Sequence, residues 1–332
     1  MIENMPVVDI LLATHNGEEF LREQLESIKL QTYQDWRVLI SDDSSTDGTR
    51  VIMREYCERD SRFSVVSHGQ VFGGSKENFF NLLKYSTNEY VMFCDQDDVW
   101  LDDKIEVSLK AMRACEGETG HSCPILVFTD AVVVDDRLQI IAPSFHKHAG
   151  LHPDNPQLTQ LIVANSAAGN SMMVNRSLAD MLREADDVES ICMHDWYAML
   201  LASAFGRIEY LSVPTLLYRQ HGGNVIGANK LTLTDKLRNR FSSINSTERN
   251  KRLQRERECA VQAASFLRQY GSRLPVRSEK QLEEYVAAIG SKSFAKGIVH
   301  LFRSGCWKVE QTERIGQVIH RLEYSVYAKM VE

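Results

Sequence analysis

The stretch "YVMFCDQDDVWLDDK", residues 90–104, carries the strongest signal for the fold. Its apolar beginning is typical of a buried strand, and five aspartates follow within nine positions. Carboxylates at that spacing repel one another unless something neutralises them. Because extended backbone points alternate side chains to one face, Asp95 and Asp97 can direct both carboxylates to the same point. The pattern therefore predicts a cation site directly behind a buried strand.

An alternation of strands and helices surrounds this stretch. Apolar runs predict strands at 7–12, 36–41, 63–67 and 89–94, and amphipathic segments between them predict helices at 18–30, 49–58 and 75–86. This order is typical of an α/β fold with a Rossmann-like, mostly parallel central sheet and helices on both faces. Ligands bind such sheets at the carboxyl ends of the strands, where this chain places "THNGEE", "SDDSSTDGT" and "CDQDD". We therefore expect these three polar clusters to meet at one edge of the sheet.

Charge divides the chain into two parts. Residues 231–332 hold 19 Lys and Arg against 11 Asp and Glu, which is a net charge of +8. The residues before them hold 19 basic and 34 acidic side chains, which is a net charge of −15. We predict that the basic part is a helical extension with a role of its own. The acidic body would be repelled by a phosphate backbone, so we expect no nucleic-acid partner.

Several classes of protein are disfavoured by missing patterns. The seven cysteines include no C-x-x-C pair, which argues against a disulfide framework or a zinc site and fits a reducing cytoplasm. No run approaches the roughly 18–20 apolar residues of a membrane span, and the start lacks a signal-peptide pattern. The chain also lacks G-x-G-x-x-G and G-x-x-x-x-G-K-[ST], which disfavours dinucleotide dehydrogenases and P-loop NTPases. We therefore expect a cytoplasmic protein.

The aspartates behind the fourth strand allow two interpretations. Two converging carboxylates suit Mg²⁺ or Mn²⁺, which keep open positions for phosphate oxygens. An acidic loop can also cap the next helix, and we expect this structural role for Asp102 and Asp103, beside Lys104. After a strand in this alternation, the metal interpretation is favoured for Asp95 and Asp97.

The stretch "SDDSSTDGT", residues 41–49, allows the same two interpretations. A carboxylate behind the second strand can accept hydrogen bonds from a nucleobase or a ribose. Ser and Asp residues at such a position also cap the helix that follows. We expect both roles here, with Asp43 facing a ligand and Ser45 or Asp47 capping the helix.

Four motifs together resemble the inverting glycosyltransferases of family 2. They are "TxNGxxFLxxQLxSIxxQTYxxWxxLIxDDxSxDGT", "CDQDDVWLxDK", "MHDW" and "LYRQHGGNV", and the resemblance covers about residues 6 to 230. The chain is most similar to the bacterial rhamnosyltransferases of cell-surface polysaccharide and O-antigen synthesis. The resemblance implies a GT-A catalytic domain over 1–230, with a nucleotide-binding half at 1–110 and an acceptor-binding half at 111–230. The helical basic region at 231–332 is only loosely similar.

The resemblance also implies a set of residues that bind the nucleotide-sugar donor. Thr14, Asn16 and Glu18 match positions that line the nucleotide, and Asp43 matches one that contacts the base or ribose. Lys76, Asn78 and Asp95 match further positions of the family that contact the donor. His15 departs from the aromatic residue usual in that loop, with little expected consequence.

The metal and catalytic positions follow from the same motifs. Asp95 and Asp97 match the residues that hold Mn²⁺ or Mg²⁺ against the diphosphate, and His221 matches a residue near the diphosphate or metal. Asp195, in "HDW", matches the base that takes a proton from the acceptor hydroxyl, with Asp130 the next candidate. His194 we expect only to pack or orient this base, whereas Trp196 is as consistent with stacking on a sugar as with a core position.

The chemistry of these residue types agrees with one-step transfer. A metal stabilises the leaving diphosphate without proton transfer, and one carboxylate base suffices for an inverting displacement. We expect dTDP-L-rhamnose as the donor and a saccharide, commonly lipid-linked in the family, as the acceptor. Two alternatives are a sugar nucleotidyltransferase, disfavoured by the acidic "THNGEEF" loop, and a non-catalytic carbohydrate-binding or scaffold protein.

The basic C-terminal region supports two hypotheses. The segment "FAKGIVHLFRSGCWK", residues 294–308, mixes cations with apolar residues as membrane-surface segments do. The protein would then lie peripherally on the inner face of the cell membrane. The alternative is a helical subdomain that packs on the core or on a second subunit, as in a homo-oligomer.

Overall fold

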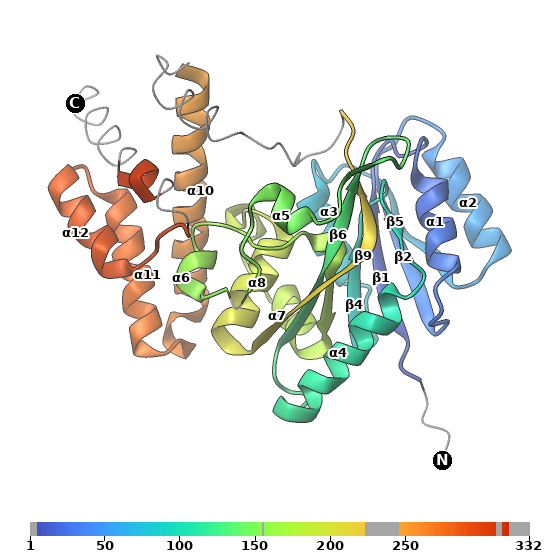
Figure 1. The fold of residues 1–332 in the computed structure, drawn as a ribbon, viewed down its shortest axis with the longest axis horizontal. Coiled ribbons are helices and arrows are strands. Elements are labelled where there is room, and N and C mark those ends of the chain that lie inside the picture. The colour runs from blue at the N-terminus through green and yellow to red at the C-terminus, as the bar shows by residue number, and fades with distance from the viewer. Residues whose placement is uncertain (1–4, 155, 223–245, 310–313, 319–332) are drawn as a thin grey trace. The chain divides into compact units, whose positions relative to one another are not determined.

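The computed structural model describes residues 5–154, 156–222, 246–309 and 314–318 (Figure 1). The chain divides into two compact units. The first is drawn from 1–155, 167–185 and 193–228, and the second from 156–166, 186–192 and 229–332. Two short segments that precede residue 230 thus belong to the second unit. The roles given to the two predicted halves of the catalytic domain stay predictions.

The first four strands of the first unit form a parallel sheet. They are β1 (Val8–Thr14), β2 (Trp36–Asp43), β3 (Phe63–Gln70) and β4 (Tyr90–Cys94), in the spatial order β3-β2-β1-β4. The connecting helices are α1 (Leu21–Lys29), α2 (Thr49–Arg59) and α3 (Ser75–Leu83). β1 and β4 are buried along their whole length, as expected for central strands of a parallel sheet. The predicted alternation is confirmed.

The sheet continues with strands of both directions. β8 (Met172–Asn175) pairs antiparallel with β4, and next come β6 (Ile125–Val134), β9 (Arg207–Arg219) and the short β5 (Val99–Trp100). β7 (Ile140–Ala142) pairs with β6 from the side. Over the described part of the chain these nine strands make one mixed sheet. The predicted α/β class is confirmed, and the second half of the sheet adds antiparallel pairs to the parallel first half.

Helices cover both faces of this sheet. Figure 1 shows α1 and α2 on one side, and α7 (Arg176–Arg183) with α8 (His194–Phe205) on the other. α4 (Lys104–Thr119) contacts β6, β8 and β9, and the short α5 (Phe145–Ala149) contacts β6. The 3-10 turn η1 (Gly169–Ser171) leads into β8. One buried cluster joins β1 to the predicted inner face of α1, and its members include Val8, Ile10, Leu12, Leu21, Leu25 and Ile28.

The second unit is helical, as predicted for the C-terminal region. Its helices are α6 (Leu158–Leu161), α10 (Ser246–Tyr270), α11 (Val276–Gly290) and α12 (Phe294–Ser304), with the 3-10 turns η2 (Val188–Ser190) and η3 (Gly271–Arg273). Its buried side chains include Phe266, Tyr270, Leu282, Tyr285 and Leu301. In the described ranges of both units, no helix is long and apolar enough to cross a membrane.

Candidate active site

The three polar clusters follow strands that end at one edge of the sheet. Leu12 of β1 lies opposite Cys94 at the end of β4, and Thr14 lies opposite Asp42 near the end of β2. The loops behind β1, β2 and β4 therefore begin side by side. This confirms the predicted meeting of "THNGEE", "SDDSSTDGT" and "CDQDD".

Gln96, between the two aspartates of the fourth-strand loop, ties that loop to the first one. Its side-chain oxygen accepts hydrogen bonds from the Thr14 hydroxyl (2.6 Å) and the His15 backbone N–H (2.8 Å). Its side-chain nitrogen donates to the His15 carbonyl (3.0 Å). A Cβ atom on Gly17 would lie 2.4 Å from the Gln96 oxygen, so a larger residue at this position would displace the Gln96 side chain from these hydrogen bonds. Sequence analysis gave Gln96 no role, because its partners lie about 80 positions away.

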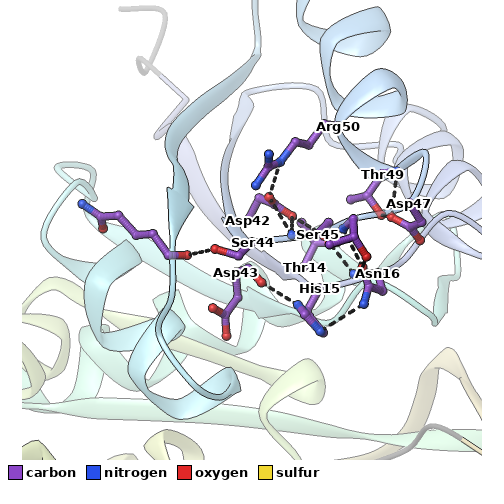
Figure 2. A network of polar contacts seen from close by, with 12 residues as sticks. Thr14, His15, Asn16, Asp42, Asp43, Ser44, Ser45, Asp47, Thr49 and Arg50 are labelled. Atoms are coloured by element: carbon purple, nitrogen blue, oxygen red, sulfur yellow. Dashed lines mark hydrogen bonds and ion pairs between the residues drawn. The ribbon is translucent and has the colours of Figure 1, made fainter.

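The loops behind β1 and β2 are joined by a polar network (Figure 2). Asn16 adopts a left-handed backbone (φ 47°), which asparagine tolerates, and its N–H donates to the Ser45 hydroxyl (2.8 Å). The Asn16 side-chain oxygen in turn accepts from the Thr46 N–H (2.9 Å). Glu18 accepts from the Gly48 N–H (2.8 Å) at the start of α2. Asn16 and Glu18 thus shape these loops, and their predicted contacts with a nucleotide stay predictions.

The three carboxylates of the second polar cluster, "SDDSSTDGT", make different contacts. Asp42 is fully buried and accepts from Arg50 Nε at 2.9 Å and from the Ser45 hydroxyl. The N-cap position of α2 is Gly48, and Asp47, one position earlier, accepts from the N–H of Thr49 (3.1 Å), the first residue of the helix, whereas Ser45 makes no such bond. Asp43 accepts from the backbone N–H groups of Phe72 (2.6 Å) and Gly73 (3.1 Å). The carboxylate predicted to meet base or ribose therefore also holds the loop that leads to α3.

The first turn of α3 carries the other two predicted donor residues. Asn78 is 2% exposed, and its side-chain N–H donates to the Ser41 carbonyl at the end of β2 (3.0 Å). Lys76 Nζ lies 3.1 Å from Glu77 Oε1. Asn78 thus anchors α3 against the edge of the sheet. Contacts of either residue with a donor stay predictions.

Asp95, Asp97 and Asp195 form a cluster of negative charge. Burial, the charge of Asp97 and then the charge of Asp195 raise the pKa of Asp95 to about 7. Asp195 lies in the first turn of α8, is 5% exposed, and accepts the Trp196 N–H (2.6 Å). The fold therefore brings together a strand-end loop and a helix start that are about 100 positions apart. This is the arrangement that the two motifs predict.

His221 lies beside Asp97. Its Nε2 is 2.8 Å from Asp97 Oδ2, and its ring centroid is 4.9 Å from that of Phe20. Within the described ranges, no three His, Cys, Asp or Glu side chains are grouped as a ready metal site. The side chains present still fit a divalent cation, because the two carboxylates repel each other and supply hard oxygen ligands. The oxygens of a diphosphate would complete the coordination shell of the cation. A ligand role for His221 stays a prediction.

Arg219 is a residue of this site that sequence analysis quoted in "YRQHGGN" but gave no role. It is 1% exposed, and its guanidinium lies 4.4 Å from the Phe20 ring centroid and bonds the Glu23 carboxylate. Its Nε donates to the Asp97 carbonyl (2.8 Å), and its backbone N–H donates to Asp98 Oδ1 (3.1 Å). Arg219 thus fixes the backbone that carries the predicted metal ligand.

The far end of the aspartate stretch differs from the prediction. The Asp103 side chain makes no capping bond to α4, so its predicted role as a cap is wrong. Lys104 is fully buried and donates to the Thr215 hydroxyl (3.3 Å), and burial lowers its pKa to about 7. Asp98, 1% exposed, accepts from the Asn170 side chain, and burial with the charges of Asp97 and Asp95 raises its pKa. This end of the stretch therefore belongs to the core.

The neighbours of Asp195 are packing residues. The His194 ring lies 4.1 Å from that of Phe79 and 5.0 Å from that of Phe93, centroid to centroid. Burial lowers the pKa of His194 to about 3, so the imidazole is neutral at physiological pH. Trp196 is 3% exposed. The packing interpretation is confirmed for His194, and the core interpretation holds for Trp196.

Asp130, the second candidate for the base, is saturated with hydrogen bonds. It accepts from the hydroxyl of Ser144 (2.5 Å), from Nδ1 and the backbone N–H of His146 (2.9 and 3.2 Å), and from the Ala131 N–H (2.8 Å). Burial opposes ionisation, but these donors outweigh it and lower the pKa of Asp130 to about 2. Such a carboxylate is a poor proton acceptor near neutral pH. Asp130 instead holds α5 to β6.

With the geometry described, comparison with known proteins identifies the family. Residues 9–182, more than half of the chain, match the family described as glycosyl transferase family 2. The chain belongs to that family. A dTDP-rhamnosyl transferase, RfbG of Shigella flexneri, is 31% identical over 230 residues, which is 66% of this chain and 74% of that protein. This family 2 glycosyltransferase is therefore an enzyme of sugar transfer.

Other glycosyltransferases are similar to this chain in sequence or in structure. The UDP-Glc:alpha-D-GlcNAc-diphosphoundecaprenol beta-1,3-glucosyltransferase WfgD of Escherichia coli is 30% identical over 106 residues, 32% of this chain and 41% of that protein. The S. aureus TarS 1-349 structure in complex with UDP aligns with a TM-score of 0.52 and 16% identity, over 93% of this chain and 92% of that one. The mannosyltransferase PcManGT from Pyrobaculum calidifontis, in complex with GDP-Man and Mn²⁺, aligns with a TM-score of 0.51 and 14% identity, over 99% and 84%. These structural likenesses confirm the GT-A glycosyltransferase fold.

Proposed function

We propose that this enzyme transfers L-rhamnose from dTDP-L-rhamnose to a saccharide acceptor, with inversion, during synthesis of a bacterial surface polysaccharide. The observation that carries the catalytic part is that Asp195 acts on the buried Asp95: burial, the charge of Asp97 and then the charge of Asp195 raise the pKa of Asp95. The donor is supported by the likeness to a dTDP-rhamnosyl transferase. The donor loops lie at the edge where α/β sheets bind their ligands.

Asp95 and Asp97 would hold Mn²⁺ or Mg²⁺, with His221 beside Asp97. When bound, the cation would neutralise charge on the leaving diphosphate. The protein's own contribution is to keep the two carboxylates in place, through Gln96 toward the first loop and through Arg219 toward β9.

Asp195 would accept the proton of the acceptor hydroxyl as the new bond forms. Its place in the first turn of α8 favours the ionised carboxylate, because the amide dipoles of a helix point their positive end there. One of its oxygens accepts the Trp196 N–H, which fixes the orientation of the carboxylate at the start of the helix. A carboxylate held in this way is oriented for general base catalysis.

The acceptor would be a saccharide carried on a lipid. The name of the E. coli relative specifies a diphosphoundecaprenol-linked acceptor for that protein. A lipid-linked acceptor would place the reaction on the cytoplasmic side of the cell membrane. This part of the proposal concerns the substrate alone and does not depend on how the protein reaches a membrane.

A donor screen tests the proposal. Thermal unfolding is followed with dTDP-L-rhamnose, UDP-Glc, UDP-GlcNAc and GDP-Man, each with and without Mn²⁺. A donor present at about 100 times its dissociation constant stabilises the fold by about 2.7 kcal/mol. We expect the largest rise in melting temperature with dTDP-L-rhamnose and Mn²⁺ together. A larger rise in melting temperature with another nucleotide sugar would make that sugar nucleotide the donor in place of dTDP-L-rhamnose. No rise with any of them would overturn the proposed site.

A further inference from the structure

The second unit exposes an apolar stripe along α12. Ala295, Val299 and Phe302 follow one another at helical spacing and are all exposed, Val299 by 48% and Phe302 by 66%. The opposite stripe of the same helix, formed by Gly297, Leu301 and Ser304, is buried. Packing of α12 is therefore satisfied by one face, and the apolar residues of the other face are not needed for it.

Cations border this stripe along one edge. Lys296 and Arg303 lie seven positions apart, each next in sequence to a member of the stripe, and both are exposed. The carboxylate of Glu284 is 3.9 Å from Arg303 and is also bonded by His300 at 2.6 Å. Arg303 keeps 64% of its side chain exposed in spite of this contact. The edge therefore presents positive charge to solvent.

An indole extends the stripe beyond the end of the helix. The ring of Trp307 packs edge-on against that of Phe302, with centroids 5.0 Å apart. Tryptophan favours the boundary between lipid head groups and acyl chains, because its body is apolar and its N–H is polar. Phe302 and Trp307 together thus form an aromatic pair at one end of the stripe.

We propose that this face of α12 is a docking surface for an anionic lipid bilayer. Apolar side chains enter the boundary between head groups and acyl chains, and the cations beside them meet lipid phosphates. Charge complementarity favours the bilayer over a second copy of the chain as the occupant, because an antiparallel two-fold contact through this face would set the cationic edge of Lys296 and Arg303 against the same edge of the other copy. The inference concerns a surface of the second unit and is independent of the catalytic proposal.

Vesicle flotation of the full chain, without nucleotide sugar, tests the docking surface. Phosphatidylcholine vesicles with and without phosphatidylglycerol serve as probes, at low and at physiological salt. We expect flotation with the anionic vesicles only, and less of it as salt rises. A protein that ignores anionic vesicles at low salt would overturn the proposal.

Two pairs of variants place the surface on α12. Val299→Ser should weaken vesicle binding several-fold, whereas Val261→Ser should not, although Val261 on α10 is equally exposed at 50%. Lys296→Glu should weaken binding by roughly five-fold or more, from about 1 kcal/mol for each cation near a charged membrane. Lys280→Glu, a charge reversal on the exposed part of α11, should have a smaller effect.

Phe302→Ser should weaken vesicle binding the most, by about ten-fold or more, because burial of a phenylalanine side chain contributes roughly 1.5–3 kcal/mol. Circular dichroism and light scattering are measured on each variant. Equal losses for Val261→Ser and Val299→Ser would move the surface away from α12. A concentration-dependent dimer that Phe302→Ser abolishes, in a protein that does not float, would make the stripe a dimer interface and overturn the proposal.

Discussion

Two buried carboxylate clusters of the same sheet behave in opposite ways. Asp130 accepts hydrogen bonds from Ser144, His146 and a backbone N–H, and its pKa falls to about 2. Asp95 faces Asp97 and Asp195 instead, and its pKa rises to about 7. The first carboxylate is stable without any ligand. The second is placed among like charges, which is the condition in which a cation binds favourably.

This difference in pKa distinguishes a carboxylate that supports the fold from one that belongs to the candidate active site. A carboxylate that the protein satisfies by itself supports the fold, and Asp130 does so by fastening α5 to β6. A carboxylate left among other carboxylates destabilises the fold, so stability does not explain its presence and a functional role does. Substitutions in the two clusters should therefore affect different properties: activity at one and stability at the other.

The largest expected effect is on turnover, from Asp195→Asn. Asparagine can still accept the Trp196 N–H at the start of α8 but cannot take a proton. We expect turnover to fall by roughly two to four orders of magnitude, with donor binding little changed. Steady-state transfer and donor titration measure the two quantities separately. Normal turnover in a folded Asp195→Asn protein would mean that the base lies elsewhere.

Arg219→Lys should have the next largest effect, although it keeps the charge. A lysine cannot bond the Asp97 carbonyl, Glu23 and the Asp136 carbonyl at once as the guanidinium does. We expect Mn²⁺-dependent nucleotide affinity to fall roughly 10- to 100-fold, as for other residues that orient metal ligands. Titration of dTDP with and without Mn²⁺ measures it.

A matched substitution controls for general loss of a guanidinium. Arg62→Lys removes a guanidinium that stacks on Trp36 at 3.8 Å and pairs with Asp60, at the opposite end of the strands. We expect it to leave nucleotide affinity unchanged. If Arg219→Lys and Arg62→Lys weaken Mn²⁺-dependent binding equally, Arg219 has no special role in positioning the aspartate loop.

Asp130→Asn should change stability and leave turnover nearly intact. The folded pKa of about 2, against an ordinary value of 3.8, corresponds to about 2 kcal/mol of stability at neutral pH. Because the folded pKa is lowered, this contribution is present above about pH 4 and is lost as the pH falls toward 2. Urea unfolding at several pH values should show the loss in the wild type and a flatter profile in the variant. A variant that loses turnover but not stability would assign Asp130 to the chemistry.

Sequence patterns predicted the parts of the fold that depend on local order. The spacing of apolar runs gave the four parallel strands, and the positions of polar clusters at strand ends gave the edge where β1, β2 and β4 end together. The same patterns, together with the family likeness, named Asp95, Asp97 and Asp195. The strands and their common edge need only the rule that parallel strands end at one edge, whereas Asp195, at the start of α8, came from the family likeness.

Residues that act through distant contacts could not be predicted in this way. Gln96 bonds residues about 80 positions away, and Arg219 bonds residues up to about 196 positions away. Their partners are set by strand order and by the register of β9, including its shifts beside Asp130. The assignment of 156–166 and 186–192 to the second unit also has no local signal.

The most direct test of the central claim is a titration of Mn²⁺ in the presence of dTDP. Wild type, Asp97→Asn and Asp130→Asn are compared by calorimetry, and EDTA followed by excess Mn²⁺ checks reversibility. We predict that wild type and Asp130→Asn bind Mn²⁺ alike, and that Asp97→Asn binds it roughly 100-fold more weakly while remaining folded. Equal Mn²⁺ affinity in Asp97→Asn and wild type would contradict the claim that these clustered carboxylates form the metal site.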